Sequence, residues 1–235
     1  MLTLWHHRPH SFIYPVTAMK RLNLFSSSIS RRVFATALSV CVAVLLATPA
    51  SAQEAQIGEP APTFSLQSAS GETVNLSDFE GQYVVLEWLN FGCPFVGKHY
   101  DSGNMQSLQE TYREKRVAWL SIVSSAKGEQ GYYPPEQMVE QKKKHNGEMT
   151  AILLDSSGEV GRTYGATVTP HMYVINPEGN LIYKGGIDDR PTTDVEDVDG
   201  ATNYVRAALN QAMNGEEVAV KRAQPYGCSV KYASK

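Results

Sequence analysis

The chain has 235 residues, enough for one domain of ordinary size with additional segments. It carries 21 Lys and Arg residues against 24 Asp and Glu residues, a net charge of −3. Five of the basic residues and none of the acidic ones precede Gln53, which leaves 16 basic and 24 acidic residues, a net charge of −8. This acidic balance argues against nucleic acid or an anionic membrane surface as a partner.

Residues 1–52 have the pattern of a secretory signal peptide. Basic residues at positions 20, 21, 31 and 32 precede an apolar stretch over 33–47 and small residues over 50–52, where cleavage is expected. The apolar stretch is too short for a membrane span, so we expect a periplasmic or secreted protein with no stable membrane span after cleavage. Met19 fits better than Met1 as the true start. Residues 30–34 resemble a twin-arginine signal, and export of the unfolded chain by the general route stays an equal alternative.

The remainder of the chain is predicted to form one domain over 53–215, followed by a tail over 216–235. Two short alternating strands, over 61–66 and 73–76, flank a glycine turn and predict a hairpin. A short connector over 76–81 leads to a run of β-forming residues over 84–89. The next helix continues to Tyr112 and is interrupted at Ser102-Gly103, where we expect a kink.

The second half of the domain alternates strands and helices. The apolar run over 117–123 predicts a strand covered on both faces. It is followed by a helix over about 135–145, a strand over 151–155, a hairpin over 171–176 and 181–184, and a last helix over about 201–214. An acidic loop over 188–199 is interpreted as solvated. This order predicts an α/β fold, a mixed central sheet with helices on both faces and an N-terminal β-hairpin.

Cys93 lies at the carboxyl end of the first long strand, where open α/β sheets place their sites. Pro94 after it is favoured at the first helical position, which puts Cys93 at or next to the N-cap. A thiolate there is stabilised by the helix dipole, so we interpret Cys93 as a redox nucleophile. The alternative is a small core residue. Lys98 and His99 would add positive potential, or else lie on a solvated helix face.

The segment over 58–214 resembles the thioredoxin-like redoxin group, which includes peroxiredoxins of the AhpC/TSA type and exported thioredoxin-like thiol reductases. The resemblance is carried by the segments 61–66, 81–86 and 88–94, by Thr169-Pro170 and by Asn176-Pro-Glu-Gly-Asn180. It implies a thioredoxin-like fold in which Pro170 is cis and faces Cys93. It also implies that Thr169 offers its backbone to an extended substrate.

Two departures from this group limit what the resemblance implies. The reductases carry Cys-x-x-Cys, but Val96 stands where the second cysteine would be, which excludes dithiol chemistry within the motif. Peroxiredoxins have Thr or Ser three residues before their reactive cysteine, and here that residue is Asn90. Its amide would donate to a peroxide oxygen or to the thiolate. Gly92 and Pro94 complete, with Asn90, Thr169 and Pro170, the expected substrate-positioning set.

Cys228 lies in the tail, beyond the last predicted helix. Tyr226, Val230 and Tyr232 make this tail unusually apolar for a free end, so we expect it to dock. The hypothesis is that it returns to Cys93 and that Cys228 acts as resolving cysteine, forming an intrachain disulfide that an external thiol reductant resets. The alternatives are a permanent structural disulfide, an inert Cys228, or an intermolecular bridge.

The sequence thus predicts an exported thiol oxidoreductase that reduces hydroperoxides or exchanges disulfides, without a cofactor or metal. A copper-binding module using Cys93, His99, His171 and Cys228 is the first alternative, although copper-delivery relatives usually have two nearby cysteines. A redox-inactive binding module on the same scaffold is the second. The substrate, the reducing partner and the oligomeric state are not determined by the sequence.

Overall fold

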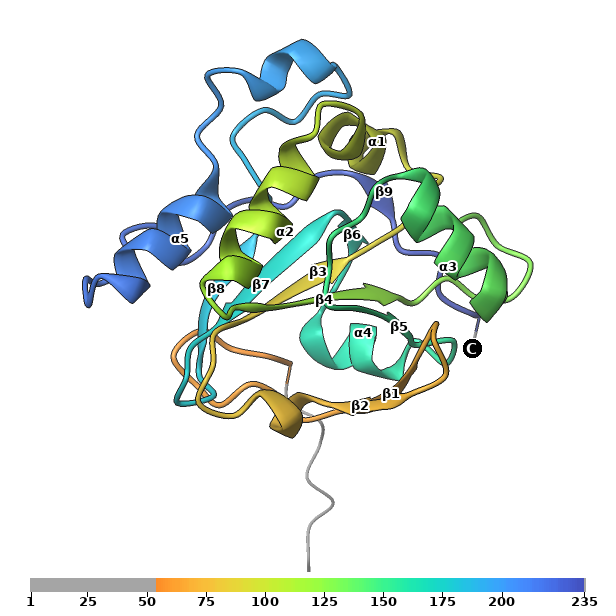
Figure 1. Ribbon diagram of the computed structural model, residues 1–235, viewed down its shortest axis with the longest axis horizontal. Helices are drawn as coiled ribbons and strands as arrows, with labels where there is room; N and C mark the ends of the chain where they lie inside the picture. The colour runs from red at the N-terminus through yellow and green to blue at the C-terminus, as the bar shows by residue number, and fades with distance from the viewer. Residues whose placement is uncertain (1–53, 235) are drawn as a thin grey trace, which may run out of the picture. The chain divides into compact units, whose positions relative to one another are not determined.

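The computed structural model describes residues 54–234 (Figure 1). The predicted signal peptide over 1–52, its cleavage site and the start at Met19 therefore lie outside the described residues. Among the helices of the described part, none is both long and apolar enough to cross a membrane.

A mixed sheet of seven strands forms the centre of the described part, in the order β2-β1-β5-β4-β3-β7-β8. Its strands are β1 (Ser65–Ser68), β2 (Thr73–Asn75), β3 (Val84–Trp88), β4 (Ala118–Val123), β5 (Ala151–Leu154), β7 (His171–Ile175) and β8 (Leu181–Gly185). The inner strands β3, β4 and β5 run parallel, and the antiparallel pairs β1–β2 and β7–β8 close the two edges. The predicted mixed sheet and N-terminal hairpin are confirmed.

Strand β3 is covered at both edges by β4 and β7 and on both faces by hydrophobic cores, so all its residues are buried. Val85 and Leu89 pack into one core with residues of the long helices, and Leu86 and Trp88 pack into the other with residues of the shortest α-helix. Successive side chains of a strand point to opposite faces, so a continuous apolar run is what two covered faces require.

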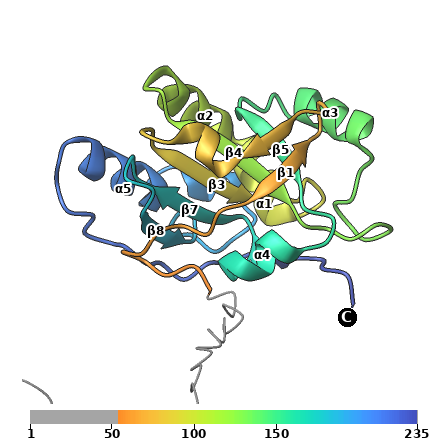
Figure 2. The same ribbon diagram turned by 90° about the horizontal axis from the view of Figure 1, so that it is seen from below.

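The helices lie on both faces of the sheet, as predicted. They are η1 (Leu76–Phe79), α1 (Pro94–Asp101), α2 (Asn104–Glu114), α3 (Pro135–Lys144), α4 (Glu159–Tyr164), η2 (Val195–Val198) and α5 (Tyr204–Met213). Figures 1 and 2 show α4 on the side of the sheet opposite α2 and α3. The fold is thioredoxin-like: a mixed sheet with the β7–β8 hairpin after α4.

The first long helix is two helices and not one kinked helix. Ser102 ends α1, and Gly103 takes φ +76°, a left-handed conformation that glycine adopts without steric cost. The last helix begins at Tyr204, later than predicted, because the side chain of Asn203 caps it by accepting a hydrogen bond of 2.9 Å from the Arg206 N–H.

The C-terminal tail docks on the domain, as the sequence predicted. Its short strand β9 (Cys228–Ser229) pairs antiparallel with β6 (Val168–Thr169), and in this register Cys228 lies opposite Thr169 (Figure 1). Val230 extends the pairing by donating its N–H to the Thr167 carbonyl at 3.0 Å. Gly227 has φ +140°, and a Cβ at this position would overlap the Thr169 carbonyl oxygen. Only glycine therefore allows this close approach of the tail.

Replacing Gly227 with Ala should loosen the tail. The added methyl group meets a backbone carbonyl, so we expect local opening to become easier by about 1–3 kcal/mol and the Val230 amide to exchange correspondingly faster. Hydrogen exchange measured by NMR checks this. Gly200→Ala is the control, because Gly200 also has a positive φ but a methyl group there would meet no atom within 4 Å. Equal protection of Val230 in both variants would contradict the docking.

Candidate active site

Cys93 occupies the position that the sequence predicted. It follows β3 after a short turn and is the N-cap of α1, with φ −89° and ψ 124°, and Pro94 is the first residue of the helix. Its carbonyl accepts the N–H groups of Val96 and Gly97 at 3.0 and 2.9 Å. The sulfur itself makes no capping hydrogen bond to the first turn. The thiol is therefore close to the positive end of the helix dipole but directed elsewhere.

The Cys93 sulfur lies between two backbone groups of other segments. Its Sγ donates to the Thr169 carbonyl oxygen at 3.1 Å, and the N–H of Cys228 donates to Sγ at 3.4 Å. The Thr169–Pro170 peptide bond is cis, as the resemblance implied. Only 1% of Cys93 is exposed, so the tail and the turn before Pro170 cover it. The structure thus brings Cys93, Thr169, Pro170 and Cys228 together.

Cys228 faces Cys93 as a second free thiol. Burial, followed by the hydrogen bond and the charge interaction with Cys93, raises the pKa of Cys228 to about 12. A thiol with so high a pKa is protonated at neutral pH. Because two of the three raising causes come from Cys93, a change in the chemical state of Cys93 also changes the acidity of Cys228.

The Asn90 amide makes hydrogen bonds to backbone groups near Cys93. Its Oδ1 accepts the Gly92 N–H at 2.8 Å, and its Nδ2 donates to the Gln130 carbonyl at 3.3 Å. Gln130 in turn donates its Nε2 to the Gly92 carbonyl at 2.8 Å. The amide thus holds the turn before Cys93 and is directed to backbone groups of that turn and of the Gln130 loop. Gly92 takes part in these hydrogen bonds with its backbone N–H and its carbonyl.

Lys98 and His99 are buried, and the alternative of a solvated helix face is wrong. The side chains of both are 0% exposed, and that of Asp188, from the loop interpreted as solvated, is 1% exposed. Lys98 Nζ is 3.5 Å from Asp188 Oδ2, and His99 Nε2 is 3.1 Å from the Tyr226 hydroxyl. Burial lowers the pKa of His99 to about 4, so the ring is neutral at pH 7 and Lys98 supplies the positive charge.

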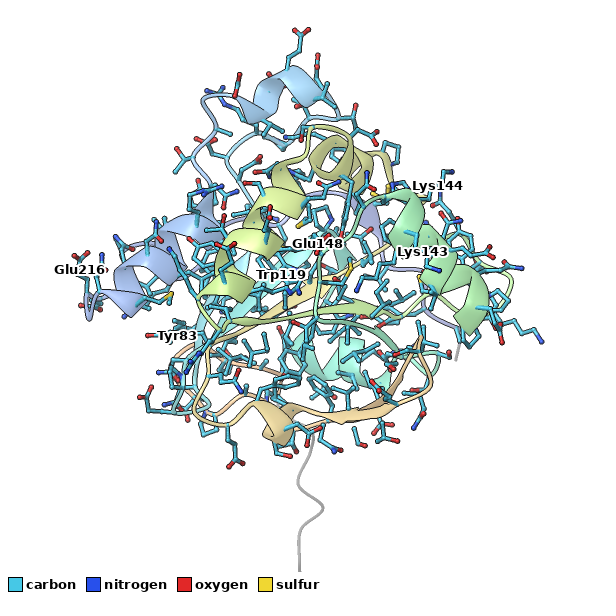
Figure 3. The ribbon with its side chains drawn as sticks, in the orientation of Figure 1. Tyr83, Trp119, Lys143, Lys144, Glu148 and Glu216 are labelled. Atoms are coloured by element: carbon cyan, nitrogen blue, oxygen red, sulfur yellow. The ribbon has the colours of Figure 1, made fainter. Side chains whose placement is uncertain are left out.

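Glu87 is a buried carboxyl that was not among the residues predicted to matter. It lies on β3 and is 0% exposed. Four side chains donate hydrogen bonds to it, from Tyr100, Gln109, Trp119 and Ser121. Figure 3 shows Trp119 in the interior, and its Nε1 is 2.9 Å from Glu87 Oε2. Burial raises the pKa of Glu87, partly offset by these donors. A lone Glu within an apolar strand run was the available signal.

The four residues of the copper alternative do not form a metal site in the described part of the chain. Within residues 54–234 there is no group of three or more His, Cys, Asp or Glu side chains placed to hold a metal ion. His99 is engaged with Tyr226 and with Asn104, and His171 Nδ1 lies 3.2 Å from the Tyr173 hydroxyl. Of the four proposed ligands, only Cys93 and Cys228 meet.

The comparisons with known proteins agree with this architecture. The sequence profile of the AhpC/TSA family matches residues 57–184, which include Cys93 and Thr169-Pro170 but not Cys228. The thiol-disulfide oxidoreductase ResA of Bacillus thuringiensis subsp. konkukian is 25% identical over 130 residues, 55% of this chain and 69% of the relative. Peroxiredoxin prdx-2 of Caenorhabditis elegans is 28% identical over 140 residues, 54% of this chain and 67% of the relative.

A solved structure shares most of the fold. The crystal structure of an uncharacterized conserved protein from Geobacillus kaustophilus superposes with a TM-score of 0.67 at 27% sequence identity, covering 77% of this chain and 94% of the other. That coverage exceeds the residues matched by the family profile.

The acidity of Cys228 should depend on Cys93. In a Cys93→Ala variant the hydrogen bond and charge of Cys93 are gone, and only burial still raises the pKa of Cys228. We expect the midpoint of its alkylation rate against pH to fall by about one unit or more, which corresponds to about tenfold more thiolate at a given pH below the midpoint. Hydrogen exchange of the Val230 amide should stay as slow as in the wild-type protein, which shows that the tail is still docked and that lost burial of Cys228 is not the cause of the fall. An unchanged midpoint would contradict the coupling.

Proposed function

The chain belongs to the AhpC/TSA family and is a thiol-dependent oxidoreductase. From this we propose that Cys93 is the redox nucleophile of the protein and that Cys228 is its resolving cysteine. The observation that carries the proposal is the approach of the Cys228 N–H to the Cys93 sulfur, at 3.4 Å. Val96, which stands where the second cysteine of a Cys-x-x-Cys motif would be, is fully buried in the core. The second thiol, which α1 lacks at Val96, comes from Cys228 in the tail.

Loss of the Cys93 proton ends the hydrogen bond from Sγ to the Thr169 carbonyl, and two other neighbours of the sulfur stabilise the thiolate that forms. The N-terminus of α1 supplies the positive end of a helix dipole, and Pro94 fixes the first turn there. The sulfur also receives the N–H of Cys228 at 3.4 Å, a donor that favours a negatively charged acceptor. The thiolate of Cys93 is the attacking species in either reaction described below.

With a hydroperoxide as substrate, the Cys93 thiolate attacks the terminal oxygen of the O–O bond. That bond breaks, the sulfur is oxidised to a sulfenic acid, and the substrate leaves as an alcohol after taking up a proton. Cys228 then attacks the Cys93 sulfur: the S–S bond forms, the S–O bond breaks, and the hydroxide leaves as water with the Cys228 proton. An external dithiol reduces the Cys93–Cys228 disulfide and is itself oxidised to a disulfide.

Oxidation of Cys93 prepares Cys228 for the second step. The negative charge on Cys93 is one of the causes that raise the pKa of Cys228, and a neutral sulfenic acid no longer carries it. Cys228 therefore becomes more acidic at the stage at which its thiolate is required. Before that stage it is held as a thiol and does not compete for the oxidant.

The geometry favours a hydroperoxide over a polypeptide disulfide. A polypeptide that pairs with the edge at Thr169 has to displace β9, since Cys228 already occupies that register. A hydroperoxide is small and needs only a local opening over Cys93. Disulfide exchange is the second candidate, supported by the similarity to ResA, which is named a thiol-disulfide oxidoreductase. In that reaction Cys93 forms a mixed disulfide, releasing one substrate thiolate, and Cys228 releases the other.

Export forms part of the proposal. The basic, apolar and small-residue segments of residues 1–52 support removal of a signal peptide and a periplasmic or secreted location. An oxidising compartment lets the pair accumulate as a disulfide and makes an external thiol reductant necessary.

One equivalent of hydrogen peroxide added to the reduced protein should produce the Cys93–Cys228 disulfide. Mass spectrometry after alkylation measures it, and dithiothreitol should reverse it. In Cys228→Ser the sulfenic acid on Cys93 should persist and be trapped by dimedone, whereas Cys93→Ser should leave Cys228 reduced. Two thiols that stay free in the wild-type protein would contradict the proposed roles.

The substrate class is tested by comparing two oxidants of the reduced protein. We expect cumene hydroperoxide to oxidise Cys93 at least about tenfold faster than the disulfides of unfolded insulin, because only the polypeptide requires displacement of β9. Gly227→Ala should narrow this difference by loosening the tail. Faster reaction with the polypeptide disulfide in the wild-type protein would assign the activity to disulfide exchange instead.

A further inference from the structure

A buried group of charged and polar side chains lies beside the two cysteines and is not used by the proposed chemistry. Lys98 and His99 from α1, Asp188 from the loop after β8 and Tyr226 from the tail form this Asp188 cluster. The Tyr226 hydroxyl donates to Asp188 Oδ1 and lies 3.1 Å from His99 Nε2 and 3.5 Å from Lys98 Nζ. The cluster joins three segments that are far apart in the sequence.

The charges in this cluster are buried at a cost that a surface loop would not incur. The Asp188 side chain is 1% exposed, and its Oδ2 has no hydrogen-bond partner among the described residues, although Lys98 Nζ and His99 Nε2 lie 3.5 and 3.9 Å away. Buried charges are expensive to desolvate and are a weak source of stability, but they can specify one arrangement among several. A specified arrangement of the tail is what a resolving cysteine needs.

Tyr226 connects the cluster to Cys228 through one residue whose backbone has little room to move. Only Gly227 separates the two residues, and it is pressed so closely against the Thr169 carbonyl that a side chain there would overlap it. Burial, followed by the hydrogen bond to Asp188, raises the pKa of Tyr226, so the hydroxyl stays a donor at neutral pH. The position of this hydroxyl therefore restricts the position of Cys228.

The cluster also ties Cys228 to the helix that carries Cys93. Lys98 and His99 lie on α1, whose N-cap is Cys93. Phe95, in the first turn of the same helix, packs its ring against Tyr226 with ring centroids 5.8 Å apart. Lys98 Nζ also lies 5.4 Å from the centre of the Tyr226 ring. Both cysteines are thus held by the same helix, one directly and one through Tyr226.

We propose that Tyr226 and Asp188 are positioning residues that hold Cys228 against Cys93 and so raise its effective concentration for disulfide formation. This inference rests on the proposed roles of the two cysteines. The β6–β9 register places Cys228 opposite Thr169. The Asp188 cluster holds Tyr226, two residues before Cys228, and so restricts the movement of the Cys228 sulfur within that register. An oriented thiol closes an intrachain disulfide more favourably than a loosely tethered one.

Tyr226→Phe is the decisive variant because it keeps the ring, with its packing against Phe95 and its position beside Lys98, and removes only the hydroxyl with its contacts to Asp188, His99 and Lys98. The readout is the equilibrium constant of the Cys93–Cys228 disulfide against a glutathione redox buffer. We expect it to fall by about tenfold in Tyr226→Phe, as the effective concentration of Cys228 falls. Asp188→Asn keeps an acceptor for the hydroxyl and should give a smaller decrease.

Two control variants separate positioning from general docking of the tail. Tyr232→Phe removes the hydrogen bond of 2.7 Å that the tail makes to the Ala166 carbonyl, beyond β9, and should leave the constant within about twofold. Tyr204→Phe, at the start of α5, should leave it unchanged. Hydrogen exchange of the Val230 amide should show the tail still paired in Tyr226→Phe.

The results distinguish this inference from the proposed function. If the wild-type protein forms no intrachain disulfide, the resolving role of Cys228 fails and this inference fails with it. If the wild type forms the disulfide and Tyr226→Phe has the same equilibrium constant as Tyr204→Phe, the positioning role alone is overturned. A loss of Val230 protection in Tyr226→Phe would also overturn it, because the cluster would then be a general anchor of the tail.

Discussion

The arrangement of the site depends on the position of the Cys93 sulfur between the Thr169 carbonyl and the Cys228 N–H. These two groups lie opposite each other in the β6–β9 register, so the same strand pairing that holds the tail also brings the second thiol to the first. Most of the fold serves this contact. Cys93 follows β3 and lies at the start of α1. Thr169 lies next to Cys93 because β7, which begins just after Pro170, pairs with β3.

Polar groups buried in the core connect β3 and α1 to the elements around them. Glu87 on β3 accepts four side-chain hydrogen bonds, and the turn after the strand is held by Asn90 and Gln130. On α1, Lys98 meets Asp188 and His99 meets Tyr226. Buried polar groups with partners fix a unique geometry, which the proposed nucleophile and resolving thiol require more than a structural core does.

Most elements could be predicted from the sequence because their signals are local. The apolar run of β3, the Cys93-Pro94 helix start and the glycine turns each depend on neighbouring residues, and the aromatic tail indicated docking. The features that the sequence did not indicate are contacts with residues that are distant in the chain. The burial of Lys98 depends on Asp188, from a loop much later in the sequence, and the orientation of Asn90 depends on the Gln130 carbonyl. Polar burial of this kind is created by tertiary packing and leaves no periodic pattern.

The most direct test of the two-cysteine mechanism is a single-turnover time course after one equivalent of hydrogen peroxide, quenched rapidly and resolved by mass. We expect the sulfenic acid on Cys93 to convert to the Cys93–Cys228 disulfide at a rate that does not change with protein concentration, because both sulfurs lie in one chain. A rate that rises in proportion to protein concentration would indicate a bridge between two molecules. Either that result or a persistent sulfenic acid in the wild-type protein would contradict the role assigned to Cys228.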